Sequence, residues 1–137
     1  MNSCKTIEAT PAASVVPAQR VKVMSVEDIP EILELENVCW LPEIRASEAT
    51  LRARFKMGHI SMGMLVNEKL VGMTSFSYTR FSTDDPDGFP ASFRDFSSRP
   101  KHDDYNTAFV YNLNIHPGYR GETLTRELIW TGIDRLR

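Results

Sequence analysis

The chain has few cysteines, no excess of basic residues and no long apolar run, and each absence excludes a class of protein. Two cysteines among 137 residues, Cys4 and Cys39, are too few for a disulfide framework. The formal net charge of −2 gives no basic field, which argues against nucleic acid as the main partner. No apolar segment approaches the roughly 20 residues of a membrane span, and the first residues lack the features of a secretory signal. These absences predict a cytoplasmic protein with no membrane partner.

Motifs for metals and nucleotides are missing as well. His59, His102 and His116 show no ligand spacing with one another or with cysteine, so we expect no metal site. The acidic run 84–87 lacks the spaced ligands and closing glutamate of a calcium loop, and it indicates a turn instead. No Gly-x-x-x-x-Gly-Lys-Ser/Thr segment is present, which disfavours a nucleotide P-loop.

The composition, 42% hydrophobic and 25% charged, is that of one globular domain. Residues 1–19 are rich in Ala, Ser, Thr and Pro without periodicity, which predicts a flexible tail and leaves 20–137 for the domain. Hydrophobic periodicity and turn residues then predict the order of elements. The expected elements are a strand at 20–24, a helix from 28 to before Pro42, a helix at 47–58, strands at 61–66 and 70–80, a loop at 81–106, a strand at 109–115 and a helix at 123–137.

The predicted helices are amphipathic. A capping-box-like pair, Ser25 and Asp28, opens the first helix. Its residues expected to face the core are Ile29, Ile32, Leu33, Leu35 and Cys39, and those expected to face water are Glu31, Glu34 and Glu36. On the last helix the expected apolar side comprises Leu124, Leu128, Ile129, Ile133 and Leu136.

The loop at 81–106 is unusually long for a small domain, so it is either a functional insertion or disordered. It is rich in turn residues, but it also carries aromatic side chains. These are Phe81, Phe89, Phe93, Phe96 and Tyr105. They predict that the loop folds back over apolar surface, either simply to cover the core or to cap a substrate cleft.

The last quarter of the chain carries the most specific pattern. A buried strand at 109–115 leads through the turn 116–121 into a helix. Such a junction places free backbone N–H groups at one point, and the helix dipole adds about half a positive charge there. The pattern therefore predicts an anion-binding site.

The run Ile115-His-Pro-Gly-Tyr-Arg-Gly121 resembles the strand end and Val-His-Pro-x-Tyr-Arg-Gly turn of the GNAT acyl-CoA N-acyltransferases. The family's Gln/Arg-x-x-Gly-x-Gly/Ala run falls on Arg120, with Thr123 and Thr125 at the two glycine positions. The broad resemblance covers residues 20–137, and its specific part is about a dozen residues. It implies an α+β fold with a mixed, mostly antiparallel GNAT-like sheet flanked by helices. Because the family continues with a splayed strand, a helix and further strands, the resemblance also implies a domain incomplete at its C-terminus.

The resemblance implies that acetyl-CoA or another acyl-CoA is the cofactor, acting as a substrate. The turn would wrap the pyrophosphate, and the strand backbone would pair with the pantetheine arm and polarise the acyl carbonyl. The implied cofactor-binding residues are Leu113, Asn114, Ile115, Tyr119, Arg120, Gly121, Glu122, Thr123, Leu124 and Thr125. Threonine at the two glycine positions brings a Cβ near the phosphates and tolerates positive φ poorly, which predicts weakened or abolished affinity. Against this, the hydroxyls can donate to phosphate, and Thr123 can cap the helix.

Catalytic residues are not assigned by the sequence. GNAT proteins often use a carboxylate acting through water as the base, and the polar strand residues Tyr111, Asn112 and Asn114 are poor bases. For the two asparagines, hydrogen bonding within the strand is an equally good interpretation. Glu122 belongs to the loop and is expected to be solvated.

Three functional hypotheses follow from the resemblance. The first is a GNAT-type N-acetyltransferase that moves an acetyl or other acyl group from acyl-CoA to an amine acceptor. The second is a catalytically inactive GNAT-fold fragment that acts as a binding or interaction module. The third is a GNAT-like domain that loads acyl groups onto a carrier protein, with decarboxylation or S-transfer as its chemistry. An open strand edge further predicts either a homo-oligomer or completion by a C-terminal half supplied by a longer protein.

Overall fold

The computed structural model describes residues 18–85 and 90–136. The predicted tail 1–19 lies almost wholly outside this part, and the first strand already includes Gln19. The strands are β2 (Gln19–Val23), β3 (Ile60–Val66), β4 (Lys69–Thr79) and β5 (Thr107–Ile115). The α-helices are α3 (Ile29–Cys39), α4 (Glu48–Lys56), α5 (Phe93–Ser97) and α6 (Glu122–Leu136), with short 3-10 turns η1 (Val26–Asp28), η2 (Pro42–Ile44) and η4 (Pro117–Tyr119).

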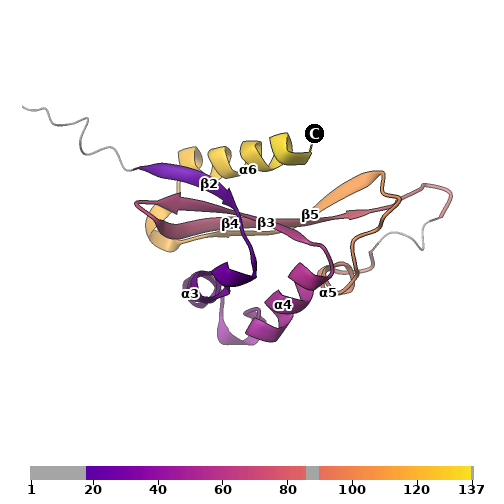
Figure 1. Ribbon diagram of the computed structural model, residues 1–137, viewed down its shortest axis with the longest axis horizontal. Helices are drawn as coiled ribbons and strands as arrows, with labels where there is room; N and C mark the ends of the chain where they lie inside the picture. The colour runs from indigo at the N-terminus through magenta and orange to yellow at the C-terminus, as the bar shows by residue number, and fades with distance from the viewer. Residues whose placement is uncertain (1–17, 86–89, 137) are drawn as a thin grey trace, which may run out of the picture.

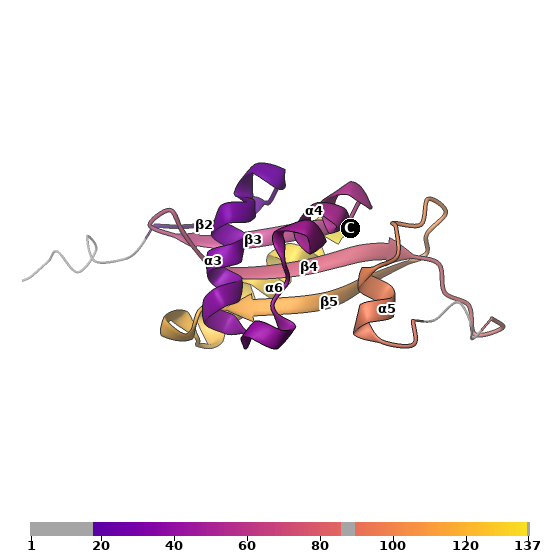
Figure 2. The same ribbon diagram turned by 90° about the horizontal axis from the view of Figure 1, so that it is seen from below.

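The strands form one antiparallel sheet in the order β2-β3-β4-β5. Figure 1 shows α6 on one face of this sheet and α3 with α4 on the other. Figure 2, from the α3 and α4 side, shows that α5 lies beside the N-terminal half of β5. The predicted α+β fold with an antiparallel sheet between helices is therefore confirmed.

Local signals in the sequence explain where the elements begin and end. The Asp28 carboxylate accepts from the Ser25 backbone N–H at 2.8 Å, as in the predicted capping box, and Ser47 Oγ accepts from the Thr50 N–H at the start of α4. Asn67 and Glu68 both have positive φ, 50° and 64°, which is the two-residue turn that a twisted hairpin favours. These signals are local, so the sequence alone could reveal them.

Apolar side chains pack on both faces of the sheet. The cluster under α3 and α4 contains Met24, Ile29, Ile32, Leu35, Leu51, Leu70 and Met73, and the cluster under α6 contains Met62, Met64, Val66, Val71, Phe76 and Leu128. Cys39 packs at the margin of the first cluster, as expected for a small core residue, and burial raises its pKa. The sheet is thus the middle layer of three.

The predicted apolar side of helix α6 is only partly buried. Leu128 is fully buried, and Leu124 and Leu136 pack at the edge of the second cluster. Ile129 and Ile133, which the helical pattern places inward, are 41% and 37% exposed. A single helix on one sheet face buries only the narrow stripe that faces the strands, so the flanks of a wide apolar side remain uncovered.

The described part of the long loop has more regular structure than its turn residues suggest. It contains α5, whose Ser92 side chain accepts from the Asp95 N–H at the helix start. Phe96 is 2% exposed and its ring lies 4.6 Å from that of Phe109 on β5. Tyr105 stacks on Tyr78 of β4. The prediction that loop aromatics fold back over apolar surface is confirmed for these residues, whereas Phe89 lies outside the described residues.

Strand β5 is an edge of the described sheet, because it pairs with β4 alone. Val110 and Leu113 on this strand are 53% and 39% exposed. The predicted open apolar edge is therefore present in the described part of the chain.

Candidate functional site

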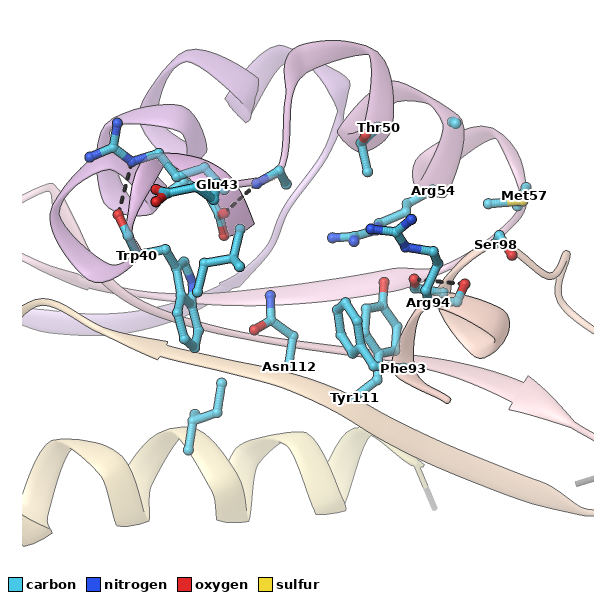
Figure 3. A pocket seen from close by; sticks show the side chains of 17 residues that line it. Trp40, Glu43, Thr50, Arg54, Met57, Phe93, Arg94, Ser98, Tyr111 and Asn112 are labelled. Atoms are coloured by element: carbon cyan, nitrogen blue, oxygen red, sulfur yellow. Dashed lines mark hydrogen bonds between the residues drawn. The ribbon is translucent and has the colours of Figure 1, made fainter. Parts of the chain in front are cut away.

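A cavity of about 840 Å³ lies between β5 and the helical layer. Its walls come from α3, η2, α4, α5 and β5, so segments far apart in the sequence meet around it. Figure 3 shows Trp40 toward one end, Asn112 below, and Arg54, Arg94, Phe93 and Tyr111 gathered toward the other end. A cavity with apolar walls and a few convergent polar groups is the usual form of a small-molecule site.

A hydrogen-bonded network of polar groups, with Glu36 and Asn114 buried at its centre, ties α3 to β5 beside this cavity. Glu36 is 2% exposed, and its two carboxylate oxygens accept from the Ala46 N–H at 2.7 Å and from Asn114 Nδ2 at 2.8 Å. The Asn114 Oδ1 in turn accepts from the indole Nε1–H of Trp40 at 2.8 Å. Because indole and backbone N–H groups only donate, the direction of each of these three hydrogen bonds is fixed.

This arrangement corrects the prediction that Glu36 faces water. Glu36 follows Ile32 by four residues and Ile29 by seven, so the helical repeat places it on the apolar stripe of α3. That spacing was the signal in the sequence, but it does not show that Asn114 and Ala46 would supply the donors. Asn114, a predicted cofactor residue, is 1% exposed, and its side-chain oxygen and nitrogen both make hydrogen bonds, to Trp40 and to Glu36.

An irregularity in β5 directs Tyr111 into the cavity. Ser75 of β4 pairs with Asn112 and its neighbour Phe76 pairs with Val110, so Tyr111 is the extra residue of a β-bulge. A bulge lets two successive side chains point to the same face, and both Tyr111 and Asn112 line the cavity.

Behind Tyr111 stands a buried histidine. His59 is 5% exposed, with Nδ1 2.9 Å from the Tyr111 hydroxyl and Nε2 2.6 Å from the Arg99 carbonyl oxygen. The carbonyl only accepts, so Nε2 carries the hydrogen, and in the neutral ring Nδ1 accepts the Tyr111 proton. Burial lowers the pKa of His59 and raises the pKa of Tyr111 to about 12. Tyr111 is therefore a proton donor at neutral pH and not a base.

Two arginines face the same end of the cavity from α4 and α5. The Arg54 guanidinium carbon lies 5.5 Å from the centroid of the Tyr111 ring and 5.7 Å from that of Phe93. Arg54 Nε is buried and has no hydrogen-bond partner among the described residues. Arg94 lines the same end of the cavity from α5 (Figure 3). Neither arginine belongs to an ion pair within 18–85 and 90–136.

A second, more open cavity of about 510 Å³ lies at the end of β5. Five of the predicted cofactor residues line it: Leu113, Ile115, Arg120, Gly121 and Thr125. Arg120 Nε donates to the Ile115 carbonyl at 3.0 Å, which holds the turn against the strand end. Leu113 lines both cavities, so they are neighbours along the strand.

The other predicted cofactor residues lie around this turn but do not line the second cavity. Tyr119 packs against the core beneath α6, and Leu124 is half-buried there. Glu122 opens α6, so it is helical and not a loop residue. Thr123 is exposed in the first turn of the helix, which corrects its suggested role as the capping residue.

The backbone at the two threonines is not strained. In the described residues, positive φ occurs at Asn67, Glu68 and Gly58 and at no residue of the turn before α6. Thr123 and Thr125 are helical, so their β-branched side chains require no left-handed backbone. The Gly121 carbonyl accepts the first helical bond, from the Thr125 N–H at 3.5 Å, and a Cβ at Gly121 would have no atom within 4 Å.

Comparison with known proteins supports one fold. No protein-family model matches the chain, and no curated protein sequence matches it significantly. Solved structures do match. The GphF GNAT-like decarboxylase in complex with isobutyryl-CoA aligns with a TM-score of 0.68 at 19% identity, over 82% of this chain and 56% of its own. The loading GNATL domain of CurA from Lyngbya majuscula gives 0.68 at 16% identity, over 83% and 56%.

A ribosomal-protein-S18-alanine N-acetyltransferase from Escherichia coli aligns with a TM-score of 0.58 at 17% identity, over 87% of this chain and 59% of its own. The chain therefore shares the fold of these GNAT structures, as the resemblance of its strand–turn–helix motif predicts. It spans a little under three-fifths of the length of these solved chains.

Two other features are absent from the described residues. None of their helices is both long and apolar enough to cross a bilayer. Nor do they contain a group of three or more side chains suited to hold a metal ion.

Proposed function

We propose that the protein containing this chain transfers an acyl group from acyl-CoA to an amine acceptor. The observation that carries the proposal is the pair of neighbouring cavities along β5 in a GNAT fold. Arg120, Gly121 and Thr125 lie at the second cavity beside the start of a long helix, where backbone N–H groups and the helix dipole favour a pyrophosphate. The first cavity then takes the acceptor, and Leu113 stands between the two.

In this arrangement the thioester lies along the open edge of β5. The strand backbone supplies a hydrogen bond that stabilises the oxyanion formed when the amine attacks the acyl carbonyl. Glu36 is not the base, because both of its oxygens already accept hydrogen bonds. Tyr111 is not the base either, because it keeps its proton at neutral pH and directs it to His59 Nδ1.

Binding of acetyl-CoA, measured by isothermal titration calorimetry, tests the proposal. We expect Arg120→Met to weaken binding at least about tenfold, the size of one lost charge-assisted hydrogen bond. Arg135→Met, at the exposed far end of α6, is the charge-matched control. Gly121→Leu adds bulk where a Cβ meets nothing within 4 Å, so it should block the cavity without unfolding the chain. Equal affinity in all four proteins would overturn the assignment of the second cavity.

A second function is favoured by the solved structures themselves. The decarboxylase and the loading domain give TM-scores of 0.68, whereas the Escherichia coli N-acetyltransferase gives 0.58. The alternative is therefore decarboxylation of a carboxylated acyl-CoA before transfer to a carrier. In that step the bond between the carboxylate and the α-carbon breaks, CO₂ leaves, and the electron pair stays on the thioester enolate until a proton arrives. Mass spectrometry of the acyl-CoA after incubation with the protein separates the functions, since only decarboxylation shortens the acyl group without an acceptor.

A further inference from the structure

We infer that the end of the first cavity between α4 and α5 binds a carboxylate group of the substrate, held by Arg54 and Arg94. The inference deepens the proposed function, on which it rests, by naming the chemical class of what enters the cavity. It depends on three observations: the convergence of two cationic groups, the lack of described acidic partners for them, and the distribution of acidic side chains in the same cavity.

The first observation is convergence. Arg54 comes from α4 and Arg94 from α5, and the close-up shows both at the end of the cavity where Phe93 and Tyr111 lie. Two guanidinium groups that share one end of a cavity repel each other, and an anion between them removes the repulsion. A planar guanidinium also matches the two oxygens of a carboxylate better than a single point charge does.

The second observation is the missing partner. The other arginine at this cavity, Arg45, donates to the carbonyl oxygens of Trp40 and Asn37. Arg54 has instead a buried Nε without an acceptor among the described residues. A charged donor held away from water without an acceptor is unfavourable. An acidic ligand in the cavity would supply that acceptor to the guanidinium group.

The third observation is the distribution of acids in the same cavity. Glu36 is committed to Ala46 and Asn114, and it lies on α3 four residues before Trp40. Glu43 lies on η2, with Trp40 and away from the two arginines (Figure 3). The cavity therefore has a cationic end over aromatic rings and an end with carboxylates. An occupant with a carboxylate at one end and its reacting group at the other fits this polarity.

The direct test is an NMR titration of the ¹⁵N-labelled chain with glutarate, at constant ionic strength, following the Arg54 Nε–H resonance. The resonance is assigned from its loss in Arg54→Lys. We expect glutarate to shift it and the neutral isostere glutaramide to leave it in place. Arg54→Met and Arg94→Met should each weaken glutarate binding about tenfold or more.

Arg52→Met is the matched control, because Arg52 lies on the same helix but pairs with Glu48 on the exposed side. Its affinity for glutarate should equal that of the unmodified chain. Amide spectra of each variant establish that it is folded, and Arg54→Gln provides a polar replacement if the methionine variant is not. Equal glutarate affinity in folded Arg54 and Arg94 variants, or an equal shift with glutaramide, would overturn the inference.

A second set of titrations locates the carboxylate on the substrate. If succinyl-CoA binds more tightly than acetyl-CoA and this preference is lost in Arg54→Met, the carboxylate belongs to the acyl group. Binding of L-glutamate that depends on Arg54, without preference between the two thioesters, places it on the amine. Glutarate binding does not require the second cavity, so failure of CoA binding alone refutes the proposed function and leaves this inference standing.

Discussion

Replacement of Glu36 by glutamine tests the buried chain of hydrogen bonds at the centre of the site. Glu36 accepts from two donors, the Ala46 N–H and Asn114 Nδ2, and Asn114 accepts from the Trp40 indole. Glutamine has nearly the same shape, but one of its terminal groups is a donor. If its oxygen faces Ala46, its NH₂ faces Asn114. If Asn114 then turns its amide, the Asn114 NH₂ faces the indole N–H. Every arrangement leaves two donors facing each other.

The expected loss of stability follows from this one unpaired donor. A buried donor without an acceptor costs about 1–3 kcal/mol, and Glu36 is almost fully buried. We therefore expect Glu36→Gln to lower the free energy of unfolding by about 2 kcal/mol, a large part of the total of about 5–15 kcal/mol for a small domain. Glu36→Leu leaves both donors unpaired and should cost more.

Urea unfolding followed by circular dichroism measures these changes. Glu34→Gln is the control, because Glu34 lies on the exposed side of the same helix and should change stability by less than about 0.5 kcal/mol. The Trp40 indole N–H resonance provides a local readout and should move in Glu36→Gln but not in Glu34→Gln. A Glu36→Gln chain as stable as the Glu34→Gln control would refute the argument that the bond directions are fixed.

Other expectations concern pH, packing and thiol reactivity. Burial lowers the pKa of His59, so as pH falls below about 6.5 this histidine is protonated in the unfolded chain before it is protonated in the folded chain. The melting temperature should therefore fall below that pH, and it should fall less in His59→Gln. Gly63→Ala places a Cβ 2.5 Å from the Met24 sulfur and 2.7 Å from Leu70 Cδ1, so two buried side chains must shift; it should cost about 1–3 kcal/mol in urea unfolding, and an unchanged stability would contradict this packing. Burial raises the pKa of Cys39, so in a Cys4→Ser chain Cys39 should react with a disulfide reagent at pH 7.5 more slowly than a free thiol, and an equal rate would contradict its partial burial.

Much of the fold could be predicted from the sequence because its signals are local. The alternation in β3 and β4, the turn at Asn67 and the caps at Ser25 and Ser47 each depend on a few neighbouring residues. The GNAT architecture followed from a strand–turn–helix motif of similar length. Such signals survive without knowledge of what packs against them.

The candidate site was harder to predict, because its polar groups acquire their roles from distant partners. The carboxylate of Glu36 is compatible with burial because the Ala46 N–H and Asn114, which is 78 residues away, both donate to it. Likewise, Tyr111 points into the cavity because of a bulge, which the sequence pattern of β5 does not reveal. Ile129 and Ile133 were predicted to be buried and are exposed. Periodicity identifies the apolar face of a helix, but not how much of that face the sheet can cover.

The connections between strands also order the assembly of the site in time. Strands β3 and β4 are joined by a two-residue turn, whereas β5 reaches β4 only across residues 80–106. Contacts near in sequence form before those that close a long loop. The hairpin should therefore form first, and the cavity, whose walls include α5 and β5, should appear only when the loop closes. In pulsed hydrogen exchange during refolding, the amides of β3 should therefore gain protection before those of β5, because the site forms after the hairpin.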